Sequence, residues 1–312
     1  MKRIKKISII FVLLLLVGGL VACNKNDNNK PEDKTIKVYT RDTTSGTRDG
    51  FMSGIGLKEA VADDSKLVAG VITTDGNGQM INYLKGDEFG IGYISLSSLA
   101  TSTLKGLKYD NVDPTEANVI SGTYKLTRNF NYIIRSEFAN EKEEQLIKAF
   151  VAYMTTQEGK AVIKSKGGIV SVSADDPTWE SIKGNHPVTA EDNKGITLNF
   201  GGSTSVESVS KALSQAFSEI AGNFVPAHNH GGSGDAYKRT QGSEKDSANG
   251  IHIGFLSREL KTDEAAASDT SGLLAIDAIV AVVNSKNELS AITKDLLQKI
   301  YTGQITKWSE VK

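Results

Sequence analysis

The chain has 312 residues, of which 39% are hydrophobic and 23% are charged, and its formal net charge is −1. These proportions are typical of a soluble globular protein that is long enough to form two compact domains. The near-neutral charge excludes the strongly basic class of proteins that attract nucleic acids through their overall field, so we expect no nucleic-acid partner.

The amino terminus has the form of a secretion signal. Four basic residues lie within residues 2–6, and the apolar run Ile9–Val17 that follows is too short to span a bilayer comfortably. The next segment, Leu20–Cys23, resembles the lipobox of bacterial lipoproteins, in which the cysteine sulfur receives a diacylglycerol. The resemblance implies that residues 1–22 are a signal peptide and that Cys23, the only cysteine, is lipidated. An ordinary signal peptide with an incidental cysteine is the alternative.

A polar tether is expected to follow the signal peptide. Residues 23–35 would hold the lipidated cysteine and a flexible segment, because Asn24–Lys34 offers no apolar side chain to bury. Cleavage before Cys23 removes four of the 36 basic residues and none of the 37 acidic ones, which leaves a formal charge of −5. The lipid would hold the protein on the outer face of the bacterial cytoplasmic membrane.

Strand patterns alternate with helix patterns from residue 36 onward. Helices are predicted at 141–155 and 206–220, where apolar residues recur at helical spacing. Strands are predicted in short β-rich runs and in one nearly continuous apolar run that Asp277 interrupts: 36–40, 89–94, 132–134, 195–200 and 273–283. The alternation favours an α/β architecture with mostly parallel sheets.

Three loops combine hydroxyl side chains with glycine, namely Thr43–Thr47, Gly202–Ser205 and Gly231–Gly234. The first two stand between a predicted strand and a predicted helix, where unpaired N–H groups favour an anion. Arg41 and Arg48 flank the first loop, and a guanidinium group can hold two oxygens of an oxyanion. Each loop alone is also explained by the preference of Ser and Thr for helix N-caps. The three together indicate an oxyanion site, although their spacing does not name the anion.

The segment Arg41–Phe51 resembles the Arg-x-x-Gly-Ser-Gly-Thr signature of bacterial phosphate-binding proteins of the PstS type. Other segments resemble further parts of that family: 202–206, 231–234, 253–260, 275–284 and 301–310. The resemblance covers almost the whole mature chain. It implies an α/β, two-lobed periplasmic-binding-protein-like fold (type II), with two crossover strands and the ligand in the interlobe cleft. It also implies capture of inorganic phosphate for the membrane permease of an ABC importer.

The order of these segments differs from the family pattern. In the family the Gly-Ser-Thr-Ser loop opens the mature protein, and the segment like 301–310 runs into the strand that carries the arginine. Joining Lys312 to Lys34 would restore that order, with the old termini fused near Asp192–Lys194. We therefore predict a circular permutant, since permutation is tolerated where termini lie on the surface. This prediction requires Lys312 and Lys34 to be close in space.

The resemblance also places the lobes and the ligand. We expect crossings near 124–135 and 280–287, one lobe formed by residues 36–128 plus 287–312, and a continuous second lobe of residues 131–285. Carried over residue by residue, the family site implies phosphate-binding residues in both lobes: Arg41, Ser45, Gly46 and Thr47 in the first, and Thr204, Ser205, Ser233, Ser257 and Arg258 in the second.

Position 258 departs from the family pattern. Some members have a Ser-Asp pair where this chain has Ser257 and Arg258, and that aspartate accepts the proton of hydrogen phosphate and so helps to reject sulfate. Asp42, Glu259 or a backbone carbonyl are the candidates to replace it. Two alternatives stay open: a binding protein for another oxyanion, such as sulfate or molybdate, and a sensing or adhesion lipoprotein without a transport role.

We expect no enzyme activity, because the chain has no Gly-x-Ser-x-Gly elbow and its four histidines have no assignable role as a base. We also expect no cofactor and no metal. His228 and His230 are placed at the rim of the cleft, and Asp75, Asp277 and Trp179 are assigned structural or rim positions. The protein is expected to be a monomer.

Overall fold

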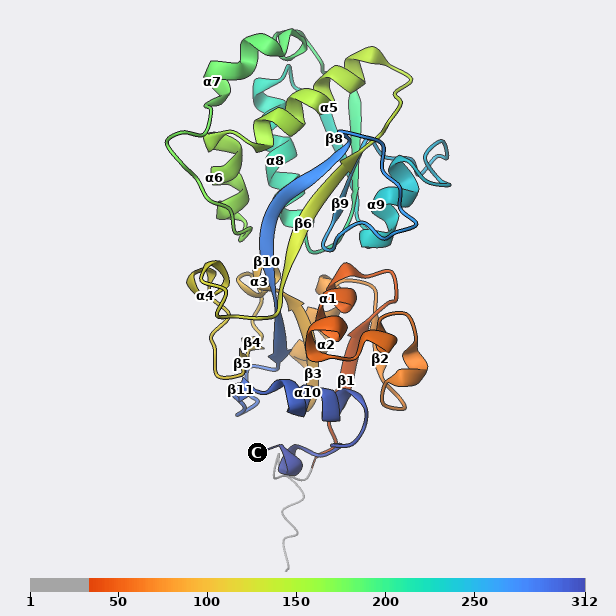
Figure 1. Ribbon diagram of the computed structural model, residues 1–312, viewed down its shortest axis with the longest axis vertical. Helices are drawn as coiled ribbons and strands as arrows, with labels where there is room; N and C mark the ends of the chain where they lie inside the picture. Colours follow the sequence, from red (N-terminus) through yellow and green to blue (C-terminus); the bar gives the residue numbers. More distant parts are fainter. Residues whose placement is uncertain (1–33, 312) are drawn as a thin grey trace, which may run out of the picture.

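Two long strands join the two lobes of the molecule, as Figure 1 shows for the computed structural model, which describes residues 34–311. These strands are β6 (Thr127–Ile134) and β10 (Ser271–Val283), and they pair antiparallel where they pass between the lobes. The α/β, two-lobed fold with two crossover strands is therefore confirmed.

The first lobe has a sheet in the order β2-β1-β3-β10, in which β1 is parallel to both neighbours and β10 is antiparallel to β3. Its strands, besides the end of β10, are β1 (Lys37–Arg41), β2 (Ile72–Thr74), β3 (Gly90–Ser95), β4 (Lys105–Gly106), β5 (Lys108–Tyr109) and β11 (Ala291–Ile292). Its α-helices are α1 (Gly46–Ile55), α2 (Asn77–Gly86), α3 (Leu96–Leu99), α4 (Glu116–Ile120) and α10 (Lys294–Tyr301).

The second lobe continues the sheet in the order β10-β6-β9-β7-β8, in which β7 is parallel to both β8 and β9. Its further strands are β7 (Thr197–Gly202), β8 (Val225–Asn229) and β9 (Ile253–Leu256). Its α-helices are α5 (Glu141–Met154), α6 (Gln157–Ser165), α7 (Trp179–Ile182), α8 (Glu207–Ile220) and α9 (Ser233–Thr240). The helices predicted at 141–155 and 206–220 are confirmed as α5 and α8.

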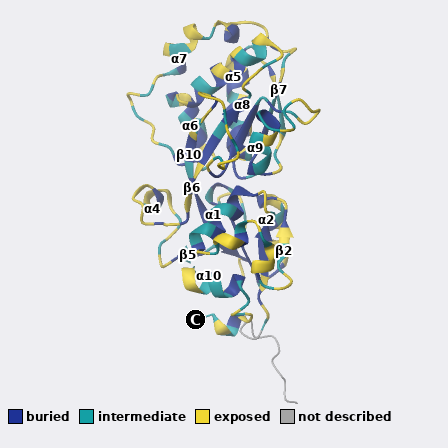
Figure 2. Ribbon diagram, turned by 45° about the vertical axis from the view of Figure 1, so that its right-hand side comes forward, coloured by how far each residue is buried: buried dark blue, intermediate teal, exposed yellow. Residues whose placement is uncertain are grey.

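Each lobe has its own apolar core, and the crossover strands pass from one core to the other within a few residues. On β6, Leu126 just before the strand packs in the first core and Phe130 packs in the second. On β10, Ala275 packs in the second core and Ala278 in the first. Figure 2 shows buried residues in the interior of each lobe, with the crossover strands between them. The second changeover lies earlier than the expected 280–287, because Ala278 already packs in the first core and the β10 residues from Ile279 onward pair with β3.

The two ends of the described chain lie side by side at the base of the first lobe (Figure 1). The Trp308 amide donates to the Lys34 carbonyl at 3.1 Å, and the Ile36 amide donates to the Thr306 carbonyl at 2.8 Å. Lys312 itself lies outside the described residues, as do Cys23 and the signal peptide. Within residues 34–311, no helix is long and apolar enough to cross a membrane.

Candidate functional site

The loop that follows β1 delivers the start of α1 to the cleft. Ser45 is the N-cap of α1, and its hydroxyl accepts from the amides of Thr47 at 3.2 Å and Arg48 at 3.3 Å. The N-cap interpretation of this loop is therefore correct for the Ser45 side chain. It is compatible with an anion site, because the helix start places positive peptide dipoles at the cleft.

Arg41 ends β1 and its side chain is only 1% exposed. Nη2 donates to the Asp75 carbonyl at 3.1 Å and lies 3.6 Å from Asp42 Oδ2. Nε and Nη1 are buried and have no hydrogen-bond partner among residues 34–311. Burial lowers the pKa of Arg41, which shows how poorly its charge is solvated. The guanidinium group therefore has two unpaired nitrogens and only a long contact with one carboxylate, whose Oδ2 has no hydrogen-bond partner in the described chain either.

Arg48, at the other end of the same loop, has a different environment. Its Nη1 donates to the Arg41 carbonyl at 2.8 Å and lies 2.6 Å from Asp64 Oδ1, while Nε donates to the Ala60 carbonyl at 3.0 Å. These contacts hold the loop to its own lobe. Of the two arginines that flank the loop, Arg48 therefore has its donors occupied within its own lobe, whereas Arg41 does not.

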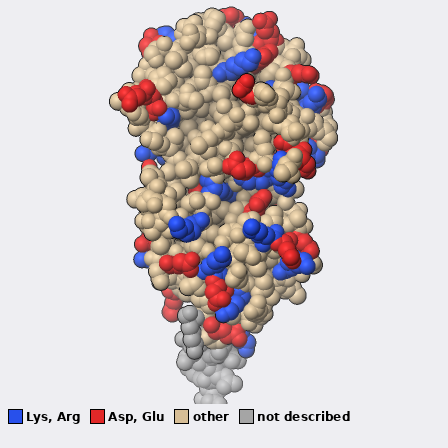
Figure 3. Space-filling model, in the orientation of Figure 1, with Lys and Arg blue, Asp and Glu red and all other residues tan. Residues whose placement is uncertain are grey.

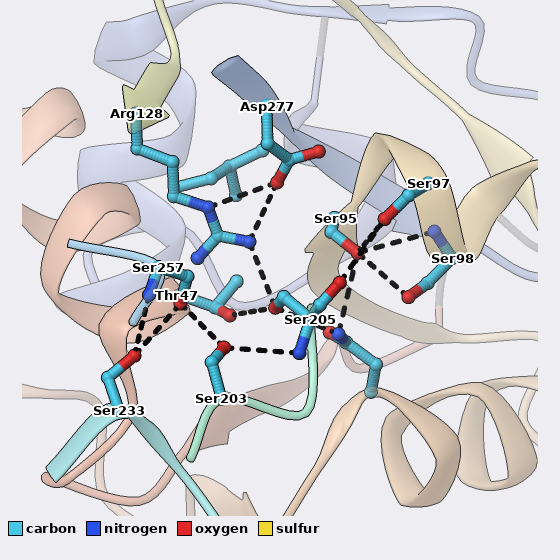
Figure 4. Close-up of polar contacts among 12 residues, drawn as sticks. Thr47, Ser95, Ser97, Ser98, Arg128, Ser203, Ser205, Ser233, Ser257 and Asp277 are labelled. Carbon is cyan, nitrogen blue, oxygen red and sulfur yellow. Dashed lines mark hydrogen bonds and ion pairs between the residues drawn. The ribbon is translucent and has the colours of Figure 1, made fainter. Parts of the chain in front are cut away.

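The second lobe contributes the hydroxyl groups that follow β7. The Ser205 hydroxyl lies 2.9 Å from the Thr47 hydroxyl of the first lobe and accepts from Asn77 Nδ2 and Arg128 Nη2, both at 3.0 Å (Figure 4). Thr204 Oγ1 is buried and has no partner in the described part of the chain. Ser205 thus connects the two lobes and one crossover strand.

A second group of hydroxyls lies beside the first. Ser257 Oγ accepts from Ser203 Oγ at 2.9 Å and lies 3.1 Å from Ser233 Oγ, which also accepts from the Ser257 amide at 2.9 Å (Figure 4). A Cβ atom added to Gly46 would lie 2.5 Å from Ser233 Oγ and 2.6 Å from Ser257 Oγ. The start of α1 therefore touches this group directly, and only glycine fits there.

The structure brings eight of the nine expected phosphate-binding residues together where the two lobes meet, and Arg258 is the exception. Its Nη1 and Nη2 bind the two carboxylate oxygens of Glu264 at 2.6 Å and 2.7 Å, and Nη1 also donates to the Glu259 carbonyl. The guanidinium group is held by this bidentate pair. Glu259 Oε1 accepts from Asn129 Nδ2 at 2.8 Å in an exposed position, so Glu259 is not grouped with the hydroxyls either.

Sequence reasoning missed Arg128 and Asn77, and it gave Asp277 only a structural or rim position. Arg128 on β6 and Asp277 on β10 are register partners, and Arg128 Nε and Nη2 donate to Asp277 Oδ2 at 3.0 Å and 2.8 Å. Both side chains are buried. The available signal was Asp277 as the one charge in an apolar strand, because a buried carboxylate needs a partner.

The distribution of surface charges indicates that the protein attracts an anion through nearby groups rather than through its overall field. On the face drawn in Figure 3, acidic and basic side chains are interspersed over both lobes, and some Lys and Arg atoms show where the lobes meet. Such a surface has no single-sign field to concentrate an anion. Anion binding must therefore come from the buried donors of the cleft.

Two histidines lie behind the hydroxyl loops. His228 Nδ1 and His230 Nε2 are 3.2 Å apart, and His230 Nδ1 lies 3.2 Å from the Ser203 carbonyl. Burial lowers the pKa of both side chains from 6.5 to about 4. Because the folded pKa is below the unfolded one, the stability they contribute is complete above pH 6.5 and is lost as the pH falls from 6.5 towards 4.

We expect this pair to make the protein sensitive to acid. The free energy of unfolding should fall by about 3 kcal/mol more between pH 7 and pH 4.5 than in a variant that lacks both imidazoles. The comparison is denaturant unfolding of the protein and of the double variant His228→Gln, His230→Gln at both pH values. Equal losses for the two proteins would show that the histidines do not titrate in this way.

Comparison with known proteins gives three results. A model of the PBP superfamily domain matches residues 17–158 and 187–312. Phosphate-binding protein PstS 2 of Streptococcus agalactiae is 27% identical over 322 residues, covering 100% of this chain and 99% of that protein, and PstS 2 of Streptococcus pneumoniae is 28% identical, covering 99% and 100%. The crystal structure of a phosphate ABC transporter phosphate-binding protein from S. pneumoniae superposes with a TM-score of 0.61 at 24% identity, over 89% of this chain and 100% of that one.

Proposed function

Because this chain belongs to the PBP superfamily, whose model matches most of its length, we propose that it captures inorganic phosphate outside the cytoplasm and delivers it to an ABC importer. The similarity to the streptococcal proteins named as phosphate-binding supports the choice of anion. Phosphate would bind between the lobes and hold them together, and opening at the hinge strands would release it to the permease.

One observation carries the proposal: unpaired buried donors from both lobes lie beside the same backbone turn. Arg41 donates to the Asp75 carbonyl while its Nε and Nη1 have no partner in the described chain, and Gly76 follows Asp75. A Cβ atom on Gly76 would lie 3.7 Å from Thr204 Oγ1, which also lacks a partner there. A tetrahedral oxyanion would satisfy these donors and place a negative charge closer to Arg41 than the Asp42 carboxylate, which is 3.6 Å away.

The remaining ligands of the proposed site follow from the same geometry. Gly46 and Thr47 lie at the start of α1, with Ser45 as its cap, while Ser205, Ser233 and Ser257 form the facing hydroxyl groups. A micromolar dissociation constant corresponds to about −8 kcal/mol, which a set of partly charge-assisted hydrogen bonds supplies after desolvation. No step of this scheme needs catalysis, a cofactor or a metal.

Calorimetric titration tests the proposal. The protein without residues 1–22 should bind phosphate with a dissociation constant on the order of micromolar, and sulfate and molybdate more weakly. No heat with millimolar phosphate would refute phosphate capture. Equal binding of sulfate and phosphate would assign the site to the broader oxyanion class. Such a result is compatible with position 258, where an arginine paired with Glu264 stands in place of a proton-accepting aspartate.

We also propose that the protein is a lipid-anchored monomer on the outer face of the cytoplasmic membrane, since Leu20–Cys23 resembles a lipobox. Metabolic labelling with a tritiated fatty acid should mark the full-length protein. The Cys23→Ala variant, which serves as the control, should be unlabelled and released into the medium. Labelling that survives the substitution would contradict the anchor at Cys23.

We propose the permuted segment order on one ground, namely that Lys34 and Trp308 are hydrogen-bonded neighbours. The family model leaves residues 159–186 unmatched and runs without a break through the proposed junction at 192–194. The streptococcal relatives, in contrast, match along the whole of both chains. A chain cut after Asp192, with residues 312 and 34 joined by a short glycine linker, should fold and bind phosphate as the parent does. Failure to fold would contradict the interchangeability of the two orders.

A further inference from the structure

The arginine of the crossover strand has donors that its structural contacts do not use. Arg128 has five N–H bonds to donate. Nε donates to Asp277 Oδ2, and the two N–H bonds of Nη2 serve Asp277 Oδ2 and Ser205 Oγ. Nη1 is buried and has no partner within residues 34–311. Two N–H bonds of a buried cation are therefore unused.

The direction of Arg128 Nη1 is visible in Figure 4. It is the guanidine nitrogen without a dashed line, and it points away from Asp277 towards the side of the cleft where Thr47 and Ser257 lie. Thr47 belongs to the start of α1, and Ser257 belongs to the hydroxyl group that contacts this helix start. Arg128 Nη1 therefore faces the same space as the donors assigned above to the anion.

Arg41 and Arg128 are close enough for their charges to interact. The positive charge of Arg128 contributes to the lowered pKa of Arg41, although burial is the larger cause. Two buried guanidinium groups that repel each other, each with nitrogens that lack a partner in the described chain, form an arrangement that an anion between them stabilises. Asp277 binds Arg128 at 2.8 Å, whereas the carboxylate beside Arg41, that of Asp42, is 3.6 Å away and compensates its charge less well.

We propose that Arg128 is a second anion-binding arginine, which donates from Nη1 to the phosphate held by Arg41, and that Asp277 is the positioning residue that aims it. This inference rests on the proposed function. It adds an anion-binding residue from a crossover strand to those that the two lobes provide. Because Arg128 lies on β6 and also donates to Ser205 of the second lobe, its contact with the anion links occupancy of the site to the hinge strands.

The two members of the pair are expected to respond with opposite signs. Arg128→Gln removes Nη1 and the charge, so phosphate affinity should fall by about 10- to 100-fold, the effect of losing a charge-assisted hydrogen bond. Asp277→Asn keeps an oxygen for Arg128 but removes a negative charge near the anion, so affinity should rise. Burial raises the pKa of Asp277 to about 6, so titrations at pH 8 compare the variant with an ionised Asp277.

Calorimetric titration of phosphate against the wild type and these variants is the test, with thermal unfolding to confirm that each variant folds. Arg135→Gln is the matched control. Arg135 directly follows β6 at the opposite end of the strand from Arg128 and binds Asp246 and the Lys245 carbonyl, so this variant should bind phosphate like the wild type. Losses of about tenfold or more in both Arg128→Gln and Asp277→Asn would identify the pair as purely structural and overturn the inference. Wild-type affinity in Arg128→Gln would overturn it too, while phosphate capture would stand. Absence of binding by the wild type would refute both.

Discussion

Replacing Arg41 with glutamine is expected to remove nearly all phosphate affinity while leaving the fold intact. The substitution deletes the charge and the two guanidine nitrogens that lack a partner in the described chain. Losing two charge-assisted hydrogen bonds of about 1.5–3 kcal/mol each raises the dissociation constant by roughly 10²- to 10⁴-fold. Calorimetric titration measures this loss, and wild-type affinity in Arg41→Gln would show that the ligand lies elsewhere.

The same substitution should not destabilise the protein in the absence of phosphate. Arg41 is a buried cation whose nearest carboxylate oxygen, Asp42 Oδ2, is 3.6 Å away, so its charge is poorly compensated. Removing such a charge is expected to leave the free energy of unfolding unchanged or to raise it. An unfolding free energy that falls with the affinity would assign Arg41 a structural role.

Arg48→Gln provides the matched control because the two arginines flank one loop. Arg48 donates to two buried backbone carbonyls and binds the half-exposed Asp64, so its loss removes the donor from both carbonyls. We expect this variant to lose about 3 kcal/mol of stability and to keep phosphate affinity within a few-fold in the folded protein. Arg41→Gln should therefore lose phosphate affinity and keep its stability, whereas Arg48→Gln should lose stability and keep its affinity.

A side chain at position 46 is expected to block the approach of the two lobes. The Cβ of Gly46→Ala would lie 2.5 Å and 2.6 Å from two serine hydroxyls of the second lobe, and 3.0 Å from the Ser257 carbonyl carbon. Those serines are hydrogen-bonded to each other, so neither can turn away without loss. We expect phosphate affinity to fall by at least about 100-fold, because the bridging contacts need the lobes in register.

Small-angle X-ray scattering distinguishes lobes that are held apart from the simple loss of a phosphate-binding group. Wild-type protein with saturating phosphate should have a smaller radius of gyration than Gly46→Ala in the same buffer. Gly78→Ala is the control, since a Cβ there meets nothing within 4 Å, and the helical position should gain a little stability. A Gly46→Ala protein that binds phosphate with wild-type affinity would contradict direct contact between the lobes at this point.

Local patterns predicted the elements well because the determinants were local. The spacing of apolar residues located α5 and α8, and the Ser45–Thr47 loop located the start of α1. The roles of Arg41 and Arg48 could not be separated in this way. Both stand at the ends of the same loop, and Arg48 is structural because of its contacts with the Ala60 carbonyl, the Arg41 carbonyl and Asp64.

Contacts between residues far apart in the sequence explain where the sequence-based prediction of the site differs from the structure. Arg128 and Asp277 are 149 residues apart and meet only because β6 and β10 cross together. Arg258 followed a family position, yet Glu264, six residues further on, binds its guanidinium group. A charged residue in a predicted buried strand was the one usable signal, and it indicated that a partner exists without naming it.

A crystal structure of the protein grown with phosphate tests the central claim most directly. The account predicts a tetrahedral anion between the lobes, within hydrogen-bond distance of Arg41 Nη1, Thr204 Oγ1 and the amides at the start of α1. An empty cleft at saturating phosphate, or an anion bound outside the cleft with Arg41 uninvolved, would contradict it.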